Sequence, residues 1–319
     1  MKVIIVGAGA TGQVYGRHLA LGGAQVTYLV KPKYEAEARR GFTLYALNER
    51  DATTPLRFED CRIVTSVEEV AAETWDQAWL TVAAPAIFQD WLPPFLEAIG
   101  EAPVVSLTAG ADVRDHLLAH LPPERLVLGL VALIAYQAPL PGETRFPEPG
   151  VAYWFPPLGA SGFSGAFDPV SDVVSSLRQG GQPARQVSDA TLAQLVPNAL
   201  LMPHLLALEQ AGWSFDRFRE RERLALASRA AREAIAIGAR RHGISPPASR
   251  LLARPLVLRL ALGASRVLIP LDIERYIEFH FTKVRSQTLL HVRRFVEVGR
   301  EQGLPTEALE TLCGRVEAC

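Results

Sequence analysis

The chain of 319 residues has little of what marks several protein classes. Its three cysteines, Cys61, Cys313 and Cys319, are odd in number and far apart, so neither a disulfide framework nor a paired-cysteine metal site is expected. A net charge of -1 excludes a polybasic nucleic-acid binder. With 49% hydrophobic and 21% charged residues, the composition is that of a globular protein and excludes a disordered or collagen-like chain.

Long uninterrupted apolar runs are also scarce. Met1 and Lys2 lead directly into the strand-like residues 3–6 without the apolar stretch and cleavage site of a secretory signal, so we expect a cytoplasmic protein. The most apolar later stretch, residues 251–271, contains Arg254, Arg259 and Arg266. Charges at this spacing favour core helices over a membrane span.

The first half of the chain alternates short apolar strands with helical patterns. Strands are expected at residues 2–6, 25–30, 78–82, 104–107 and 126–133, with a helix at 11–21 after the first. Apolar strands that alternate with helices indicate a parallel sheet covered on both faces. From about residue 168 the pattern is helical, with helices expected at 189–209, 214–241 and 272–302. We therefore predict an α/β domain at residues 1–167 and an all-α domain at 168–319.

The sequence Gly7-Ala8-Gly9-Ala10-Thr11-Gly12 is a G-x-G-x-x-G motif between the first strand and the first helix. Gly7 permits the turn, Gly9 allows the backbone to approach a pyrophosphate, and Gly12 allows the helix to pack on the strand. Ala10 and Thr11 open the helix, whose N-terminus favours anions. This context predicts a Rossmann-type, doubly wound sheet that binds a dinucleotide. The alternative is a glycine-rich turn without a ligand.

The end of the second strand indicates which dinucleotide binds. NAD-dependent enzymes place an acidic residue there to hold the ribose 2′-hydroxyl. This chain has Lys31 and Lys33 instead, which are two of only four lysines among its 33 basic residues. A 2′-phosphate pairs with such cations, so we predict NADP(H). The alternative is that both lysines are ordinary solvent-exposed side chains.

Together, these features resemble the ketopantoate reductase (2-dehydropantoate 2-reductase) family. The best landmarks are residues 3–12, 104–110, 189–198 and 282–305. The resemblance implies a Rossmann domain, a helical substrate domain, NADPH, and reduction of a 2-oxo acid in the cleft between the domains, which places the protein in pantothenate biosynthesis.

The chain departs from the family pattern at several polar positions. The family's catalytic lysine corresponds to Gln194, although the asparagine four residues later is retained as Asn198. A second lysine, after the fourth strand, is replaced near Ala83, and the asparagine that ends the fifth strand is replaced by Ala109. By the resemblance, both alanines are expected to lie at the cofactor site. The substrate-binding glutamate of the C-terminal helix corresponds to Gln287. A glutamine amide donates a hydrogen bond but no proton at neutral pH. Three explanations therefore remain: another residue supplies the proton, the substrate differs from that of the family, or the protein has lost catalytic turnover.

A polar cluster near the C-terminus offers a relocated site. On a continuous helix, Tyr276, His280, Lys283 and Gln287 share one face. His280 or Lys283 is the predicted proton donor, with Asn198 and Gln194 as further catalytic candidates. Tyr276, Arg285 and Gln287 are predicted to contact the substrate, since such side chains bind carboxylates. The alternative is a solvated helix face with its aromatic residues partly buried.

No metal site is expected, because His116 and His120 lack a third ligand at useful spacing. We predict an NADPH-dependent reductase of a small 2-oxo acid or related carbonyl. Two alternatives remain: an NADP(H)-binding sensor or interaction protein without turnover, and an opine-type or other imine reductase. The expected partner is a small molecule, not a nucleic acid or a membrane. Two long helices of the second domain could also pair two chains into a homodimer.

Overall fold

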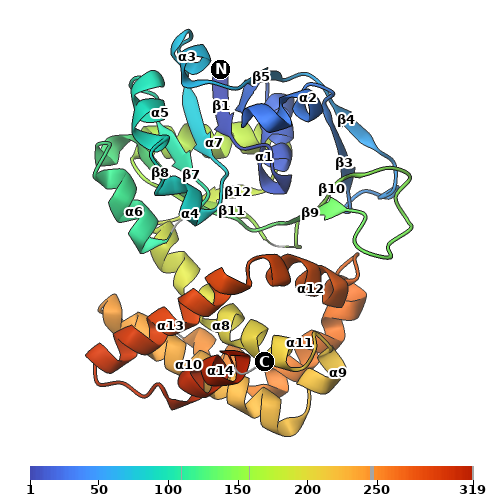
Figure 1. Cartoon of the computed structure of the whole chain (residues 1–319), viewed down its shortest axis with the longest axis vertical. Coiled ribbons are helices and arrows are strands. Elements are labelled where there is room, and N and C mark those ends of the chain that lie inside the picture. Colours follow the sequence, from blue (N-terminus) through green and yellow to red (C-terminus); the bar gives the residue numbers. More distant parts are fainter. Residues whose placement is uncertain (109, 158, 245–247, 318–319) are drawn as a thin grey trace. The chain divides into compact units, whose positions relative to one another are not determined.

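The computed structural model describes residues 1–108, 110–157, 159–244 and 248–317. The chain folds as two compact units, Met1–Thr191 and Leu192–Cys319 (Figure 1). This division lies later than the boundary at 167/168 that we predicted. The reason is that α7 (Phe167–Gln179) and β12 (Ala184–Gln186) pack with the sheet of the first unit.

An eight-stranded sheet forms the centre of the N-terminal unit. In spatial order its strands are β12, β11 (Ser161–Ser164), β8 (Leu126–Leu130), β7 (Val104–Ser106), β6 (Gln77–Leu80), β1 (Lys2–Val6), β2 (Gln25–Leu29) and β5 (Arg62–Val64). All neighbours are parallel except β8 and β11. Strand order reverses on either side of β1, and ligands of open α/β sheets bind at such a switch point.

Alternate residues of β1 enter two different hydrophobic clusters. Val3 and Ile5 join the cluster on one face, and Ile4 joins the cluster on the other. A strand buried on both faces needs an uninterrupted apolar sequence. The apolar run at residues 3–6 is therefore explained by the burial of β1 on both faces of the sheet. The predicted α/β fold with a helical second half is confirmed.

Helices cover the sheet of this unit. They are α1 (Ala10–Leu21), α2 (Glu35–Ala38), α3 (Val67–Ala71), α4 (Ala84–Ile87), α5 (Leu92–Ala98), α6 (Ala111–Leu118) and α7, with single turns η1 (Pro32–Tyr34) and η2 (Pro123–Arg125).

A second sheet in the N-terminal unit was not predicted. Its order is β4 (Leu56–Phe58), β3 (Phe42–Ala46), β10 (Gly150–Trp154) and β9 (Ile134–Ala138). The central pair, β3 and β10, is parallel and joins Leu44 to Val151 across more than a hundred residues of sequence. Residues 139–167 therefore contain the two strands β10 and β11 and the start of α7.

The second unit is helical throughout the residues described. Its elements are α8 (Ala190–Gln210), which begins in the first unit, α9 (Phe215–Phe218), α10 (Arg221–Arg241), η3 (Ala248–Ala253), α11 (Pro255–Leu268), α12 (Ile273–Lys283), α13 (Arg285–Glu301) and α14 (Glu307–Glu317). Small residues let α10 contact its neighbours closely. A Cβ on Gly238 would lie 2.1 Å from the Leu195 side chain of α8.

Three expected helices differ in detail. Ser214 caps the short α9, and α10 starts only at Arg221. The expected helix at 272–302 is broken at Val284, which has φ −110 and ψ 19 and separates α12 from α13. The helix expected in the core between 251 and 271 does form, as α11, but none of its residues is buried. The prediction of a core helix there was wrong.

One helix among the described residues, α8, is long and apolar enough by composition to cross a membrane. It carries Pro197 and Pro203, and 39% of its most apolar window is buried inside the protein. The core helices of soluble proteins pass the same test, so this finding is weak evidence for a span.

Candidate functional site

The glycine loop has the backbone conformation that its sequence predicts. Gly7 has φ +95, which L side chains rarely adopt, and its N–H donates to the Leu29 carbonyl at 3.0 Å. A Cβ on Gly12 would lie 2.4 Å from the Gly7 carbonyl oxygen and 2.6 Å from the Thr81 Oγ1. Only glycine therefore lets the first turn of α1 lie this close to the strand.

Gly9 differs from its neighbours because a Cβ there would meet nothing within 4 Å. It is the N-cap of α1, no side chain caps that helix, and its first turn carries no acidic residue. Ala10, Thr11 and Gly12 form the first turn. Free N–H groups and the helix dipole at this end favour an anion such as a phosphate.

A cavity of about 1100 Å³ opens beside this loop. Gly7 and Gly9 line it from the loop, and Lys31 lines it from the end of β2. Its other lining residues include an apolar group: Leu29, Val30, Phe42, Val67 and Val82. The cavity lies at the carboxyl ends of β1, β2 and β6, where open α/β sheets bind their ligands.

The two lysines after β2 have different surroundings. Lys31 lines the cavity, whereas the Nζ of Lys33 lies 4.7 Å from the centroid of the Tyr34 ring. Tyr34 also lines the cavity. Lys31 is thus the better placed of the two to pair with a phosphate in the cavity.

Sequence reasoning missed several residues that line the cavity, among them Gln13 and Glu37. The Gln13 side chain donates to the Ala8 carbonyl at 2.8 Å and braces the glycine loop from inside α1. Glu37 reaches the cavity from α2, although no acidic residue occupies the end of β2 itself. No sequence signal identifies Glu37, because its place beside the cavity depends on the path of the chain through the turn η1. Its carboxylate would repel a 2′-phosphate bound in this cavity.

The two alanines proposed for the cofactor site follow the ends of strands. Ala83 is the N-cap of α4, directly after Val82, which lines the cavity. Ala109 lies outside the described residues.

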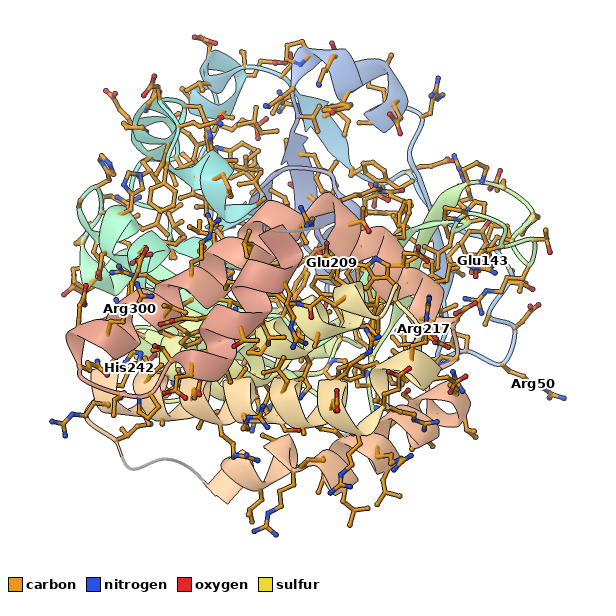
Figure 2. All side chains as sticks on the ribbon, turned by 60° about the horizontal axis from the view of Figure 1, so that its bottom comes forward. Arg50, Glu143, Glu209, Arg217, His242 and Arg300 are labelled. Carbon is orange, nitrogen blue, oxygen red and sulfur yellow. The ribbon has the colours of Figure 1, made fainter. Side chains whose placement is uncertain are left out.

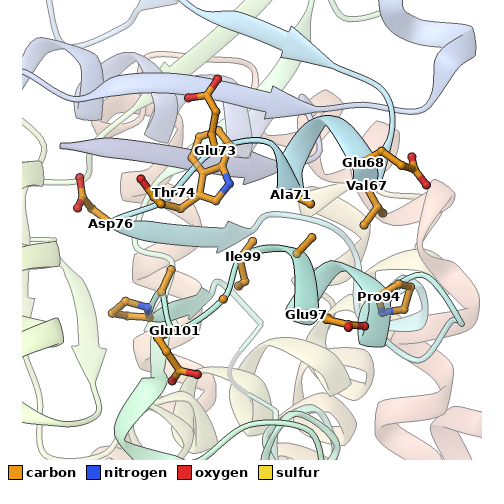
Figure 3. A pocket seen from close by; sticks show the side chains of 15 residues that line it. Val67, Glu68, Ala71, Glu73, Thr74, Asp76, Pro94, Glu97, Ile99 and Glu101 are labelled. Atoms are coloured by element: carbon orange, nitrogen blue, oxygen red, sulfur yellow. The ribbon is translucent and has the colours of Figure 1, made fainter.

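A second hollow, of about 780 Å³, lies between α3 and α5, beside the start of β6 (Figure 3). Its rim carries the carboxylates of Glu68, Glu73, Asp76, Glu97 and Glu101. These negative charges disfavour a dinucleotide, and the hollow is separate from the glycine loop. Among the described residues, no three His, Cys, Asp or Glu side chains are grouped as metal ligands.

In the helical unit, α12 brings several of the proposed catalytic side chains together. The rings of Tyr276 and His280 are stacked with centroids 5.5 Å apart, and Phe281 contacts the same imidazole edge-on at 4.8 Å. The Lys283 Nζ lies 3.6 Å from the Phe279 ring centroid. Burial, and then the positive charge of Lys283, lower the pKa of His280 below its ordinary value of 6.5.

The remaining candidates lie on α8 and α13. Gln194 and Asn198 are both half-buried and one turn apart on α8, so they share a helix face. Arg285 is paired with Glu209, which Figure 2 labels in the helical unit. Gln287 follows the break at Val284, so the single face predicted for residues 276–287 on one helix is not formed. The side chain of Gln287 lies outside the described residues.

His204, on α8, is a packing residue. Its Nδ1 bonds to the Leu200 carbonyl, and its ring is T-shaped to Phe218 at 6.2 Å. Burial lowers the pKa of His204, so its neutral form is favoured.

Residues 3–158 match the family described as "Ketopantoate reductase PanE/ApbA". This match confirms the expected resemblance over residues 3–158. No curated protein matches the chain by sequence.

Solved structures share the fold over the whole chain. One is 2-dehydropantoate 2-reductase from Geobacter metallireducens GS-15, with 19% identity, a TM-score of 0.72, and coverage of 100% of this chain and 99% of that one. A ketopantoate reductase from Ralstonia eutropha JMP134 has 18% identity, a TM-score of 0.73, and coverage of 100% and 98%. D-mandelate dehydrogenase, solved with NADH and anilino(oxo)acetate, has 14% identity, a TM-score of 0.72, and coverage of 100% and 97%.

Proposed function

Because residues 3–158 form a domain of the ketopantoate reductase family, we propose that this protein is an oxidoreductase that reduces a small 2-oxo acid or a related carbonyl with NADPH. The observation that carries the proposal is the coincidence of the glycine loop with the cavity. The loop leaves Gly9 open, and Gly7, Gly9 and Lys31 line the same space. The uncapped N-terminus of α1 supplies the charge that a pyrophosphate requires.

The residues present fit a nicotinamide dinucleotide. Gly7, Gly9 and the first turn of α1 would hold the pyrophosphate, and Lys31 would hold the 2′-phosphate. Val30, Tyr34 and Phe42 line the same cavity and would supply apolar and aromatic surface to the adenosine. When bound, the nicotinamide supplies a hydride to the carbonyl carbon.

The chain itself must then supply a proton to the developing alkoxide. Gln194 cannot do so, since an amide does not release a proton at neutral pH. We assign the proton donor to His280, with Lys283 beside it as a positive charge that attracts a substrate carboxylate. Asn198 and Tyr276 would orient the substrate. Arg285 is paired with Glu209, so its guanidinium would have to bind Glu209 and a substrate carboxylate at the same time.

The preference for NADPH can be tested at Lys31. Lys31→Ala is expected to weaken NADPH binding by about tenfold to a hundredfold, because a charge-assisted pair is lost, and to leave NADH binding nearly unchanged. Fluorescence titration with both nucleotides measures this. Lys33→Ala is the matched control and should have a smaller effect, since Lys33 lies over Tyr34. An equal loss of affinity for both nucleotides in Lys31→Ala would contradict the assignment.

Glu37→Gln should strengthen NADPH binding in the same titration, because the carboxylate that disfavours a 2′-phosphate is removed.

The reaction itself is tested by NADPH consumption with ketopantoate, on protein already shown to bind NADPH. Turnover on the order of 1–1000 per second is expected if His280 and Lys283 replace the family lysine. Such turnover would support a role in pantothenate biosynthesis, for which we propose a cytoplasmic location. Tight binding without turnover would remove ketopantoate as the substrate, and a series of other 2-oxo acids follows.

One observation favours a second candidate function. The family's lysine position holds Gln194 beside an intact glycine loop. A protein that binds NADP(H) as a sensor would keep the loop and not the acid. NADPH binding without oxidation by any 2-oxo acid, alone or together with an amine, would favour this function over both the reductase and the imine reductase.

A further inference from the structure

Gln13, near the start of α1, combines a polar side chain with deep burial. Only 9% of the residue is exposed, and it lines the cavity beside the glycine loop. A buried amide costs free energy unless both its N–H groups and its oxygen find partners. The partners of these two ends therefore indicate what the cavity can bind.

The nitrogen of this amide has its partner within the chain. Nε2 of Gln13 donates to the Ala8 carbonyl at 2.8 Å, and the backbone N–H of Gln13 donates to the Gly9 carbonyl at 2.9 Å. Helical side chains point back towards the N-terminus of their helix, which explains how Gln13 reaches the loop. A carbonyl oxygen can only accept, so this bond fixes which end of the amide is the nitrogen.

The oxygen of the same amide has no such partner. Within residues 1–108 and the other described parts of the chain, no N–H or O–H group donates to Oε1 of Gln13. This oxygen is not fully buried, so it is accessible from the cavity that Gln13 lines. A ligand that displaces water from the cavity must bring a donor to this oxygen, because an unpaired buried acceptor weakens binding.

The proposed dinucleotide carries few donors that suit this position. Its pyrophosphate oxygens are acceptors, like Oε1 itself, whereas the ribose hydroxyls donate. Lys31 lines the same cavity from the end of β2, where dinucleotides place the adenosine ribose. In NADPH the 2′-oxygen of that ribose carries the phosphate and has no hydrogen. The 3′-hydroxyl is therefore the donor of this sugar that remains for Oε1 of Gln13.

Other acceptors in the cavity are less well prepared for a hydroxyl. The carboxylates of Glu37 and Asp90 belong to exposed residues, so they are solvated and must be ordered when a ligand binds. The Thr65 hydroxyl already lies 3.3 Å from the Glu69 carboxylate. The Gln13 amide is buried and held at its nitrogen, so its oxygen is fixed in place before the ligand arrives.

We propose that Gln13 accepts a hydrogen bond from the 3′-hydroxyl of the adenosine ribose while it holds Ala8 of the glycine loop. This inference rests on the proposed function, since it requires that the cavity binds the nucleotide. One side chain thereby couples the position of the loop to the sugar of the ligand. Gln13 is a binding residue for the adenosine half of the cofactor and takes no part in hydride transfer.

Titration calorimetry with ADP and 3′-deoxy-ADP tests the proposal, because these two nucleotides differ only in the hydroxyl concerned. Wild-type protein should bind 3′-deoxy-ADP about threefold to tenfold more weakly than ADP, the usual contribution of one hydrogen bond. Gln13→Met keeps the length of the side chain and removes both polar atoms. It should bind the two nucleotides equally, and urea unfolding checks that the variant is folded.

The matched control is Gln137→Met, which changes an exposed glutamine of β9 that lines the same cavity. It should keep the wild-type ratio of the two affinities. Equal binding of ADP and 3′-deoxy-ADP by wild-type protein would overturn the proposal without any variant. A ratio that persists in Gln13→Met, or that disappears in Glu37→Ala instead, would also overturn it and assign the hydroxyl elsewhere. Wild-type protein that binds neither ADP nor NADPH would refute the proposed function itself.

Discussion

Gly9→Ala is expected to weaken nicotinamide-nucleotide binding strongly while leaving the stability of the protein unchanged. Gly9 has φ −70 and ψ 178, which alanine adopts without strain, and its added Cβ would meet no protein atom within 4 Å. The methyl group would instead occupy the space into which a pyrophosphate must come against the loop. We expect NADPH affinity to fall at least about a hundredfold.

Gly12→Ala is the companion variant and is expected to lower the stability of the protein. Its Cβ would lie 2.4 Å from the Gly7 carbonyl oxygen and 2.6 Å from the Thr81 Oγ1, so α1 must shift. Overpacking of this kind costs about 1–3 kcal/mol of unfolding free energy. Urea unfolding and NADPH titration of both variants separate the two effects. If Gly9→Ala bound NADPH normally, the cavity would not be the nucleotide site.

His280→Ala is expected to lower kcat by about a hundredfold to ten-thousandfold, the usual contribution of a general acid. KM for the carbonyl should change much less, because the stacked ring of Tyr276 and the charge of Lys283 remain. His242→Ala is the matched control, since His242 is an exposed histidine at the end of α10 in the same unit (Figure 2). An unchanged kcat in His280→Ala would remove this residue from the mechanism.

The pH dependence of kcat gives an independent test of the same assignment. Burial and the charge of Lys283 lower the pKa of His280 below 6.5. A proton donor is active when protonated, so kcat for reduction should fall as the pH rises through this lowered pKa. Lys283→Ala removes one of the two causes. The pKa of His280 should then rise towards 6.5 and move the decline of kcat to higher pH, which NMR titration of the imidazole would follow directly. A decline at the same pH in Lys283→Ala would contradict the coupling.

The sequence by itself determined the strand, loop and helix at residues 2–21. These elements are specified locally, because the glycine spacing and the apolar run of β1 act over a few neighbouring residues. The same holds for the alternation of strands and helices, from which the fold class followed. The sequence also determined that Gln194 cannot replace a catalytic lysine as proton donor, because a glutamine amide releases no proton at neutral pH in any fold.

Long-range packing decided the remainder. The pairing of Leu44 with Val151 builds a second sheet that no local pattern indicates, and the turn after β2 brings Glu37 to the cavity beside Lys31. The break at Val284 separates two helices whose sequences read as one. In α11 the sequence specified an apolar helix face, and only the tertiary structure showed that the chain leaves that face uncovered. The spacing of apolar residues indicates which side of a helix is hydrophobic. Only the arrangement of the other elements determines what packs against that side.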